Sequence, residues 1–396
     1  MARALERTPW PLLALLMATT AIGPATLNML LPALPQLVVL LAAETSTVQL
    51  TLSLYLLSLA SAQLLLGPLS DRFGRRPVLL AGLALNVAAS VAAIAANSIT
   101  LLIAARMLQA VGASAGIVIG RAIIRDLFER ERSAAMLGLV TTAMVVAPML
   151  SPALGGVLVT TWGWEAIFIC IALLSGIVLV WAIAVLPETH PPGDAASSGV
   201  LLKEWRELFR HRKFYGFVLS GALASAPFFT VIGGGPHVVV SQMHRSPTEY
   251  GIWFALGSIG YMSGNFTVSR LSERLGVEAL IATGALIEVV GAAISVLLVV
   301  YAWELGPFVI FGPQLIISYG NGLVLPSAIA GAISIRPQAA GAASGLLGFT
   351  QMALGAAATQ MVPLALAGAD TALPMAWMVL AVSLACGAAY VLGVRR

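Results

Sequence analysis

Two ionisable side chains lie inside apolar stretches of this sequence, where a charge is costly. Arg106 stands in IAARMLQAVGASAG and Glu288 in LIEVVGAA, and neither segment contains another charged residue. Ionisable groups at such positions are functional by default, because they can pair, hold a counter-charge or carry a proton. We hypothesise that Glu288 binds and releases a proton, helped by Arg106 or His237. Two alternatives stay open: Arg106 anchors neighbouring backbone carbonyls, and Glu288 is a neutral, hydrogen-bonded acid on an outer face.

The other residues that could do chemistry form no pattern. The chain has four histidines and two cysteines, Cys170 and Cys386, without metal-ligand spacing. It contains no phosphate-binding glycine loop and no nucleophile motif. We therefore expect no enzyme, no metal or cofactor site and no direct use of ATP. The cations fall in short segments between apolar stretches, so we also expect no nucleic-acid partner.

The composition predicts that these residues are positioned by membrane helices. Hydrophobic residues make up 59% of the 396 residues, charged residues only 10%, and the mean hydropathy is +0.95. A membrane helix needs about 20 mainly apolar residues. The long apolar runs lack the alternation of a β-barrel, and they predict twelve spans: 11–33, 47–68, 77–96, 99–122, 134–160, 163–186, 214–240, 248–268, 278–301, 306–330, 339–366 and 371–393. The predicted fold class is an all-α membrane protein.

The positive charges predict the orientation of the spans. With the N-terminus placed in the cytoplasm, all 21 Lys and Arg residues except Arg106 and Arg245 fall in cytoplasmic segments. Basic residues collect on that side of a membrane. The bias supports an even number of spans, with both the N- and C-termini cytoplasmic.

The chain also repeats itself. Residues 69–74 read LSDRFG and residues 271–276 read LSERLG, and each hexapeptide follows the second span of its half. The longest polar stretch, 187–213, lies between the halves. We therefore predict an N-terminal six-helix bundle over 1–186, a cytoplasmic linker over 187–213 and a C-terminal six-helix bundle over 214–396.

The segment GPLSDRFGRR, residues 67–76, carries the strongest motif. Glycine allows tight turns and close helix approach, and an acidic side chain can cap a helix or accept from a cation. The segment resembles the loop signature of the major facilitator superfamily, G-x-L-x-D-R-x-G-R-R. Parallel six-plus-six repeats with a substrate site between them are typical of that fold. The resemblance implies a conformational latch between the two halves, made by Gly67, Asp71, Arg72, Gly74, Arg75 and Arg76. A merely solvated charged turn is the alternative.

Two further elements resemble motifs of the same superfamily. Arg106 and Gln109 match the R-x-x-Q-G element of the fourth span, where the arginine is linked to proton transfer, with Ala110 replacing the glycine. The fifth span resembles the antiporter pattern G-x8-G-x3-G-P-x2-G-G, which implies export. Its residues here are Gly138, Ala147, Ser151, Pro152, Gly155 and Gly156. Generic close packing of small residues is the alternative.

At the level of a subfamily, the chain resembles the bicyclomycin/chloramphenicol-resistance group (Bcr/CflA) of multidrug:proton antiporters. The similarity includes LPALPQL at 31–37, RAIIRDLF at 121–128 and GAASGLLGFTQ at 341–351. It implies a multi-pass protein of the bacterial inner membrane that acts as a monomer. One departure from the group matters: Asn28 stands where the group carries an acid in the first span. Asparagine cannot exchange a proton, which is why Glu288 becomes the candidate.

Few charges and several aromatic residues in the expected pore suit a neutral or weakly cationic amphipathic compound. The candidate substrate-binding residues, chosen by analogy, are Asn28, Tyr55, Gln63, Phe228, Phe229, His237, Asn321 and Gln351. We expect export of a small-molecule drug or metabolite in exchange for protons. A proton-independent facilitator or uptake carrier is the alternative, because Asn28 replaces the acid. A membrane enzyme or transport-dead receptor finds no motif to support it.

Overall fold

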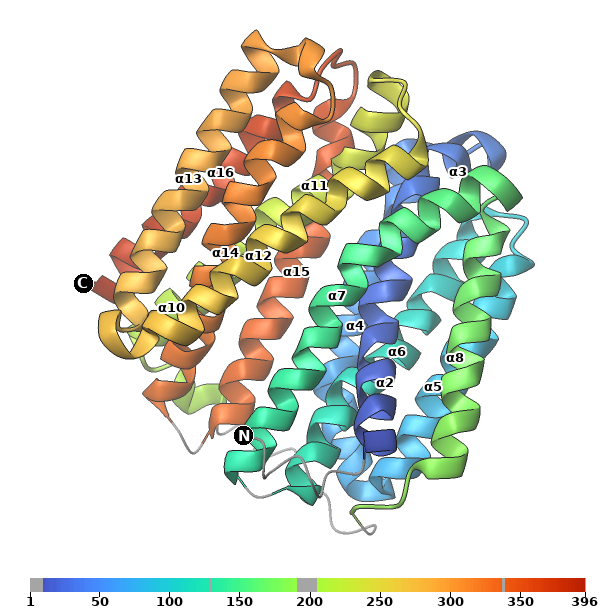
Figure 1. The fold of residues 1–396 in the computed structure, drawn as a ribbon, viewed down its shortest axis with the longest axis vertical. Coiled ribbons are helices and arrows are strands. Elements are labelled where there is room, and N and C mark those ends of the chain that lie inside the picture. Colours follow the sequence, from blue (N-terminus) through green and yellow to red (C-terminus); the bar gives the residue numbers. More distant parts are fainter. Residues whose placement is uncertain (1–9, 129, 191–204, 337–338, 396) are drawn as a thin grey trace.

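The computed structural model describes residues 10–128, 130–190, 205–336 and 339–395, and within these ranges it contains helices and no β-strand (Figure 1). The predicted all-α class is therefore confirmed. The first half forms α2 (Trp10–Met29), the 3-10 turn η1 (Leu31–Ala33), α3 (Leu34–Leu40), α4 (Thr45–Phe73), α5 (Arg75–Ile94), α6 (Ile99–Leu127), α7 (Arg130–Trp162) and α8 (Glu165–Val185).

The second half repeats this succession. It forms α10 (Arg212–Ala224), α11 (Ala226–Pro236), the π-helical η2 (His237–Gln242), α12 (Pro247–Leu275), α13 (Val277–Tyr301), the 3-10 turn η3 (Trp303–Leu305), α14 (Phe308–Ile335), α15 (Ala340–Leu366), α16 (Leu373–Tyr390) and the π-helical η5 (Val391–Arg395). Of the predicted linker 187–213, residues 191–204 lie outside the described part of the chain.

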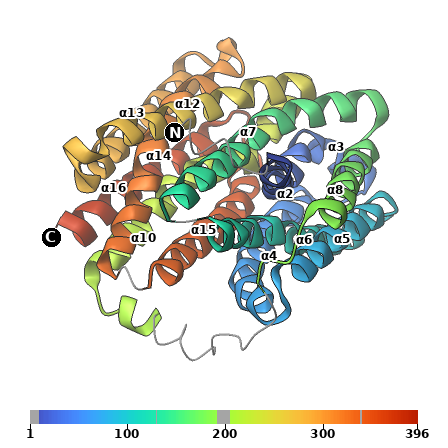
Figure 2. The same cartoon turned by 60° about the horizontal axis from the view of Figure 1, so that its bottom comes forward.

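Ten helical segments in the described residues are long and apolar enough to cross a membrane. α12 and α15 are as long as these segments but are not among the ten by hydropathy and charge. They are the helices through which the second half contacts the first, α12 against α7 and α15 against α4 (Figures 1 and 2). Small and polar residues suit such a position, because they let two helices approach closely.

Proline interrupts two of the spans. Pro227 has no N–H to donate, and the helix divides at Ser225 into α10 and α11. The first span divides in the same way at Leu30, just before Pro32. α7 instead continues through Pro148 and Pro152. Both breaks, at Leu30 and at Ser225, are buried and give the first and seventh spans irregular backbone inside the protein.

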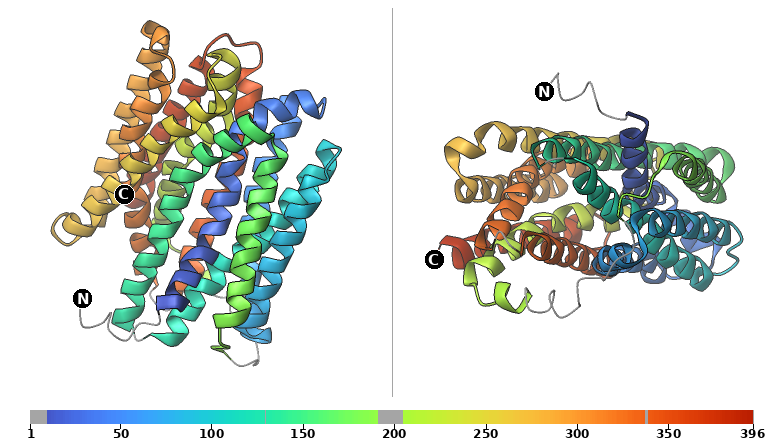
Figure 3. Two further views of the ribbon diagram at one scale, coloured as in Figure 1. Left: turned by 45° about the vertical axis from the view of Figure 1, so that its right-hand side comes forward. Right: turned by 90° about the horizontal axis from the view of Figure 1, so that it is seen from below.

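The described helices pack as two sets, α2–α8 and α10–α16, which Figure 3 shows beside each other in blue to green and in yellow to red. We call the end of the bundle with the α4–α5 turn at Gly74 and the α12–α13 turn at Gly276 the Gly74 end. The opposite end, where α12 begins, is the Tyr250 end.

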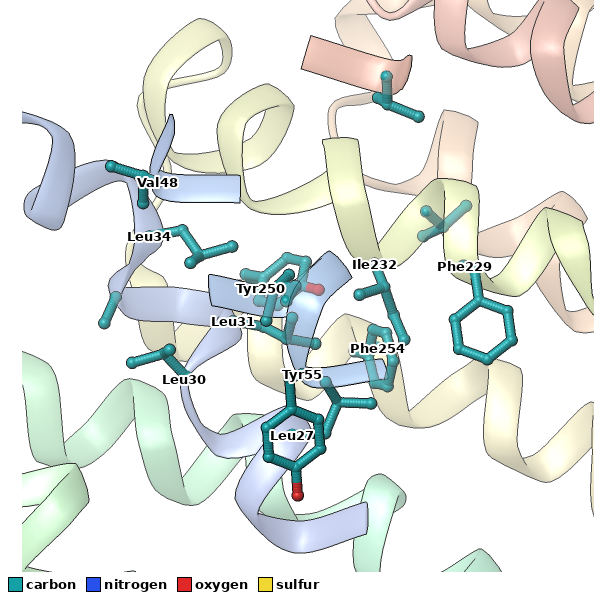
Figure 4. Close-up of a cluster of buried hydrophobic side chains, with 14 of the residues drawn as sticks. Leu27, Leu30, Leu31, Leu34, Val48, Tyr55, Phe229, Ile232, Tyr250 and Phe254 are labelled. Atoms are coloured by element: carbon teal, nitrogen blue, oxygen red, sulfur yellow. The ribbon is translucent and has the colours of Figure 1, made fainter. Parts of the chain in front are cut away.

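Among the residues whose burial the structure describes, the apolar clusters join the two sets at one end and keep them separate at the other. The largest cluster contains Leu30 and Leu31 from the first half together with Ile232, Tyr250 and Phe254 from the second, all at the Tyr250 end (Figure 4). At the Gly74 end each half keeps a separate core, one drawn from Leu12 to Leu186 and the other from Leu208 to Val394. In the described residues, the halves thus share one apolar core at the Tyr250 end and have separate cores at the Gly74 end.

Among the helices that extend further than hydropathy predicted are α4 and α12. α4 ends at Phe73 rather than near 68, and α12 ends at Leu275 rather than near 268. Each stops at a glycine with a positive φ, 96° at Gly74 and 77° at Gly276, a conformation that costs glycine little. Gly67 therefore lies inside α4, and a β-carbon on it would meet no atom within 4 Å. The expectation that Gly67 permits a tight turn or a close helix approach is wrong for this conformation.

Candidate functional site

Arg106 is fully buried among the helices of the first half. Its Nη1 donates to Thr26 O and to Gln109 Oε1, both at 3.0 Å, and its guanidinium lies 4.3 Å from the centre of the Tyr55 ring. The Tyr55 hydroxyl in turn donates to Gly23 O at 3.0 Å. These contacts agree with the alternative that Arg106 anchors neighbouring carbonyls. They also place Tyr55, predicted to bind substrate, in a fully buried contact with the cation.

No carboxylate pairs with Arg106 among the described residues. Asn28, which stands at the position of the missing acid, is also buried. Its amide nitrogen donates to Pro24 O of the same helix at 2.8 Å, and its Oδ1 has no hydrogen-bond partner. Arg106 Nη2 likewise has none. The site therefore combines an unneutralised cation with an unused acceptor and an unused donor.

A polar network that the sequence did not predict continues from Arg106 through Gln109. Gln109 Nε2 donates to Ser90 Oγ at 2.7 Å, and Asn86 Nδ2 donates to Gln109 O at 3.0 Å. Ser175 Oγ donates to Asn86 Oδ1 at 2.8 Å. The signal in the sequence was a polar pair, Asn86 and Ser90, one helical turn apart in an otherwise apolar span.

In the second half, two groups of predicted residues come together at the helix break. Gln351 Nε2 donates to Ser225 Oγ at 2.9 Å, and Ser225 Oγ donates to Asn321 Oδ1 at 3.4 Å. Phe228 and Phe229 stack edge to face at 5.5 Å. The ring of Phe228 also lies 5.7 Å from Phe254, which continues to Tyr250 at 5.8 Å. Ser225, Tyr250 and Phe254 were not among the predicted site residues.

His237 lies apart from these groups, at the Tyr250 end. It lines a cavity of about 590 Å³ together with Glu44, Gln49, Gln242 and Pro363, residues drawn from both halves. Gln49 is buried and its Nε2 has no partner. Gln63 is half-buried further along α4 toward the Gly74 end and makes no hydrogen bond to another predicted residue.

Glu288 is fully buried in α13, and neither carboxyl oxygen has a hydrogen-bond partner. Its side chain lies against Gly320 of α14. The outer-face alternative for Glu288 is therefore wrong. The polar and ring contacts of Arg106 all come from α2, α4 and α6, so the structure brings neither Arg106 nor His237 to Glu288.

At the Gly74 end, Arg75 connects the motif to other helices of the first half. It pairs with Asp71, and its Nε donates to Asp126 Oδ2 at 3.0 Å and its Nη1 to Ser70 Oγ at 2.6 Å. Arg72 instead lies over the Phe73 ring at 5.2 Å. The side-chain bonds of Asp71 and Arg75 stay within the first half, so these two residues make no bond to the second half in the described part of the chain.

Glu188, which the sequence did not single out, caps the start of α5. Its carboxylate accepts from the backbone N–H groups of Arg75 and Arg76 at 2.9 and 3.1 Å. Arg76 Nη2 also donates to Ile183 O at 2.9 Å. Partial burial alone would raise the pKa of Glu188, but hydrogen bonds from His190, Arg75, Arg76 and Thr189 together lower it. The anion is favoured at a helix N-terminus.

The small residues of α7 make close contacts with two other helices. Gly155 lies against the backbone of Met29, and Gly156 lies against the backbone of Pro247 and Thr248 at the start of α12. Ser151 donates to Ala147 O within α7, where Gly138 and Pro152 also lie. Gly251 of α12 lies against the backbone of Pro152. Pro152 and Gly156 of the predicted antiporter pattern thus lie on the surface where the halves meet, whereas Gly155 packs against α2 of its own half.

A profile of the Major Facilitator Superfamily matches residues 16–360. Over 369 residues the chain is 32% identical to the uncharacterized MFS-type transporter YdgK of Bacillus subtilis, covering 92% of this chain and 90% of that protein. Over 342 residues it is 29% identical to multidrug resistance protein D of Escherichia coli, covering 86% and 85%. The bicyclomycin resistance protein homolog of Haemophilus influenzae is 25% identical over 359 residues, covering 89% and 88%.

Among solved structures, a bacterial homolog of the human lysosomal transporter Spinster, in an inward-facing and occupied conformation, superposes with a TM-score of 0.77. The match covers 97% of this chain and 96% of the other at 15% identity, which shows a shared fold. Fold and sequence agree: the chain belongs to the major facilitator superfamily, has relatives named for multidrug and bicyclomycin resistance, and is a multi-pass membrane transporter rather than an enzyme.

Proposed function

We propose that this chain is a secondary active transporter that exports drugs or small amphipathic metabolites across the bacterial inner membrane in exchange for protons. The observation that carries the proposal is the packing of the two halves, joined at the Tyr250 end and separate at the Gly74 end. A transporter that exposes its site to one side at a time needs such a one-sided contact. The names of the relatives, which refer to multidrug and bicyclomycin resistance, support drugs as the substrate class.

In this proposal, residues 1–186 and 214–396 rock against each other within one monomer. The basic Gly74 end faces the cytoplasm, and the structure corresponds to the inward-facing state. The latch formed by Gly67, Asp71, Arg72, Gly74, Arg75 and Arg76 would then bind the second half only after the Gly74 end closes. Its present bonds, all within the first half, support this order.

The proposed substrate site lies between Asn28 with Tyr55 on one side and Phe228, Phe229 and the Ser225 group on the other. Aromatic surface with a few hydrogen-bonding groups suits an amphipathic compound. Arg106 adds a positive charge without a carboxylate partner, which favours neutral substrates over cationic ones. His237 and its cavity would be the exit at the Tyr250 end.

We further propose Glu288 as the group that carries the proton. It is buried and its carboxyl group has no bonded cation, so the ionised form is costly and the protonated form is favoured. In this scheme, Arg106 stabilises the packing of the first half, while Glu288 binds and releases the proton in the second half.

A proton-independent facilitator is the second candidate. It is favoured by Asn28, whose amide bonds to Pro24 O and whose position carries no exchangeable proton. In that case substrate moves down its own gradient through the same conformational cycle.

Everted membrane vesicles with an acidic interior separate the two candidates. Uptake of chloramphenicol and of a fluorescent cation would be followed with and without an uncoupler. We expect uncoupler-sensitive uptake, larger for chloramphenicol than for the cation. Uptake that ignores the uncoupler would replace proton exchange with facilitated diffusion. Vesicles containing an Asp71→Asn variant give the matched control for the conformational cycle, since both candidates require it.

A further inference from the structure

Equivalent helices of the two halves can be aligned residue by residue with a constant offset in sequence number. α4 and α12 both begin and end 202 residues apart, at Thr45 and Pro247 and at Phe73 and Leu275. Each is followed by a glycine with positive φ, and α5 and α13 begin at the next residue. A residue of α5 therefore corresponds to the residue of α13 that lies 202 positions later. With this offset of 202 residues, Asn86 corresponds to Glu288.

The packing around the two residues confirms the correspondence. A β-carbon on Gly112 of α6 would lie 2.7 Å from Asn86 N, and one on Gly320 of α14 would lie 3.1 Å from Glu288 N. Gly82 and Gly284, one turn earlier in α5 and α13, face the carbonyls of the same two glycines. Asn86 and Glu288 thus occupy the same place against the neighbouring helix.

In the first half this place is a polar joint among three helices. Asn86 of α5 donates to Gln109 O of α6 at 3.0 Å and accepts from Ser175 Oγ of α8 at 2.8 Å. All three residues are buried. A buried amide held by both a donor and an acceptor fixes the relative position of the helices that supply them.

In the second half the matching partners are present, but their bonds are not made. For α6 and α14 the offset in sequence number between equivalent residues is 208, as Gly112 and Gly320 show. The same offset relates Ser175 of α8 to Ser383 of α16. Ser383 is fully buried, and its hydroxyl has no partner. Both oxygens of Glu288 also lack one. Three unsatisfied polar atoms therefore lie at the counterpart of a satisfied joint.

The charges around Glu288 decide which form of the acid fits. Cys386, one turn from Ser383 on α16, is the titratable group in the described chain that interacts with Glu288, and its thiol donates to Ser220 O of α10. α14 and α16 contain no charged residue, and no ion pair in the described chain includes Glu288. An ionised carboxylate would be a buried, unpaired anion, which is unfavourable by several kcal/mol. The neutral acid offers one O–H donor and one acceptor oxygen, the set that the Asn86 amide uses.

We propose that Glu288 is a proton-binding joint of the second half. In its protonated form it donates to the carbonyl of Ile317, the counterpart of Gln109, and accepts from Ser383 Oγ. It then ties α13 to α14 and α16 as Asn86 ties α5 to α6 and α8. Loss of the proton removes the donor and leaves a charge between three helices, so the second half must repack while the first does not. This inference rests on the proposed proton exchange for its role in transport, but not for the joint itself.

The test compares full-length variants by thermal unfolding in detergent and by uptake into everted vesicles. Glu288→Gln keeps a neutral donor and acceptor, and we expect its unfolding temperature to match the wild type. Glu288→Leu and Ser383→Ala remove the joint and should unfold at least about 2 °C lower. Asn86→Leu is the matched control in the first half and should show a similar loss. Infrared spectra at neutral pH should contain the C=O band of a protonated acid that disappears in Glu288→Gln.

The outcomes separate the joint from proton coupling. A stable Glu288→Gln that loses uncoupler-sensitive uptake supports both. If Glu288→Gln is stable and its uptake is unchanged, the joint stands and Glu288 is not the coupling group. The proposed joint is overturned if Glu288→Gln unfolds at as low a temperature as Glu288→Leu, or if the wild type lacks the protonated-acid band. Either result overturns it regardless of the uptake measured.

Discussion

Replacing Gly156 by alanine should open the contact between the two halves. A β-carbon at this position would lie 2.6 Å from Pro247 O and 2.8 Å from Thr248 N. Ordinary contacts are longer than about 3.4 Å, and these atoms belong to the backbone at the start of α12, so they cannot rotate away. α7 and α12 must therefore separate by several tenths of an ångström wherever Gly156→Ala is accommodated.

The magnitude follows from overpacking. Forcing an extra methyl group into a well-packed contact costs about 1–3 kcal/mol. The cost falls only on the state in which the halves meet at the Tyr250 end, so the equilibrium moves toward the opposite state by about 5- to 150-fold. The effect on overall stability should be smaller, because each half keeps its separate core at the Gly74 end.

The assay is labelling of a reporter cysteine by a membrane-impermeant maleimide. Leu31→Cys, in a background without Cys170 and Cys386, places the thiol in the shared cluster, where Leu31 is fully buried. We expect faster labelling in Gly156→Ala. Gly176→Ala is the matched control, since a β-carbon at Gly176 meets no atom within 4 Å. Equal labelling rates in Gly156→Ala and Gly176→Ala would refute the reasoning.

Three further predictions concern the two ends and the buried cation. Glu188→Gln should lower the free energy of unfolding by about 1 kcal/mol at neutral pH, through loss of the α5 cap. Because folding lowers the pKa of Glu188 from its usual 4.5, this gap should close as the pH falls below that value in acid unfolding curves. Arg106→Lys should keep the charge but lose the fit to Tyr55 and Gln109, reducing vesicle uptake about tenfold or more with normal abundance on immunoblots; unchanged uptake would leave charge alone as its role. Gln360→Ala removes hydrogen bonds to Ser46 O at 2.9 Å and from Ser53 at 3.0 Å between α15 and α4. It should raise labelling of Leu31→Cys, whereas no change would show that these bonds do not hold the Tyr250 end.

Hydropathy predicted the helix ends well where every face of the helix is apolar. It predicted them less well where a helix continues beyond the lipid. α8 and α13 have the strongest apolar signal and follow their predicted ranges closely. α4 and α12 continue as helices through the charged residues of LSDRF and LSERL. Charge ends an apolar run but does not end a helix. The glycine with positive φ ends it, and that conformation is not visible in hydropathy.

The site was harder to predict, because its contacts join distant parts of the chain. The sequence singled out Arg106 and Glu288 by their cost in lipid, but it could not show that Arg106 has its partners within the first half and that the Glu288 carboxyl group has no hydrogen-bond partner. It missed Glu188, whose importance depends on a meeting with Arg75 that is 113 residues away. It also missed Asn86, although the repeat of 202 residues that relates Asn86 to Glu288 was already evident from the two hexapeptides.

The separate core of the first half has a consequence for how the chain enters the membrane during synthesis. The carbonyls that Arg106 uses belong to Thr26 and Thr51, which leave the ribosome before it. Its charge can therefore be solvated by protein as soon as α6 inserts, before any of the second half exists. Leu30 and Leu31 instead become fully packed only after Tyr250 of the second half has been synthesised. During synthesis the apolar surface of η1 therefore stays uncovered after the rest of the first half has packed. We expect chaperone or insertase contacts to persist on η1 until α12 has been inserted.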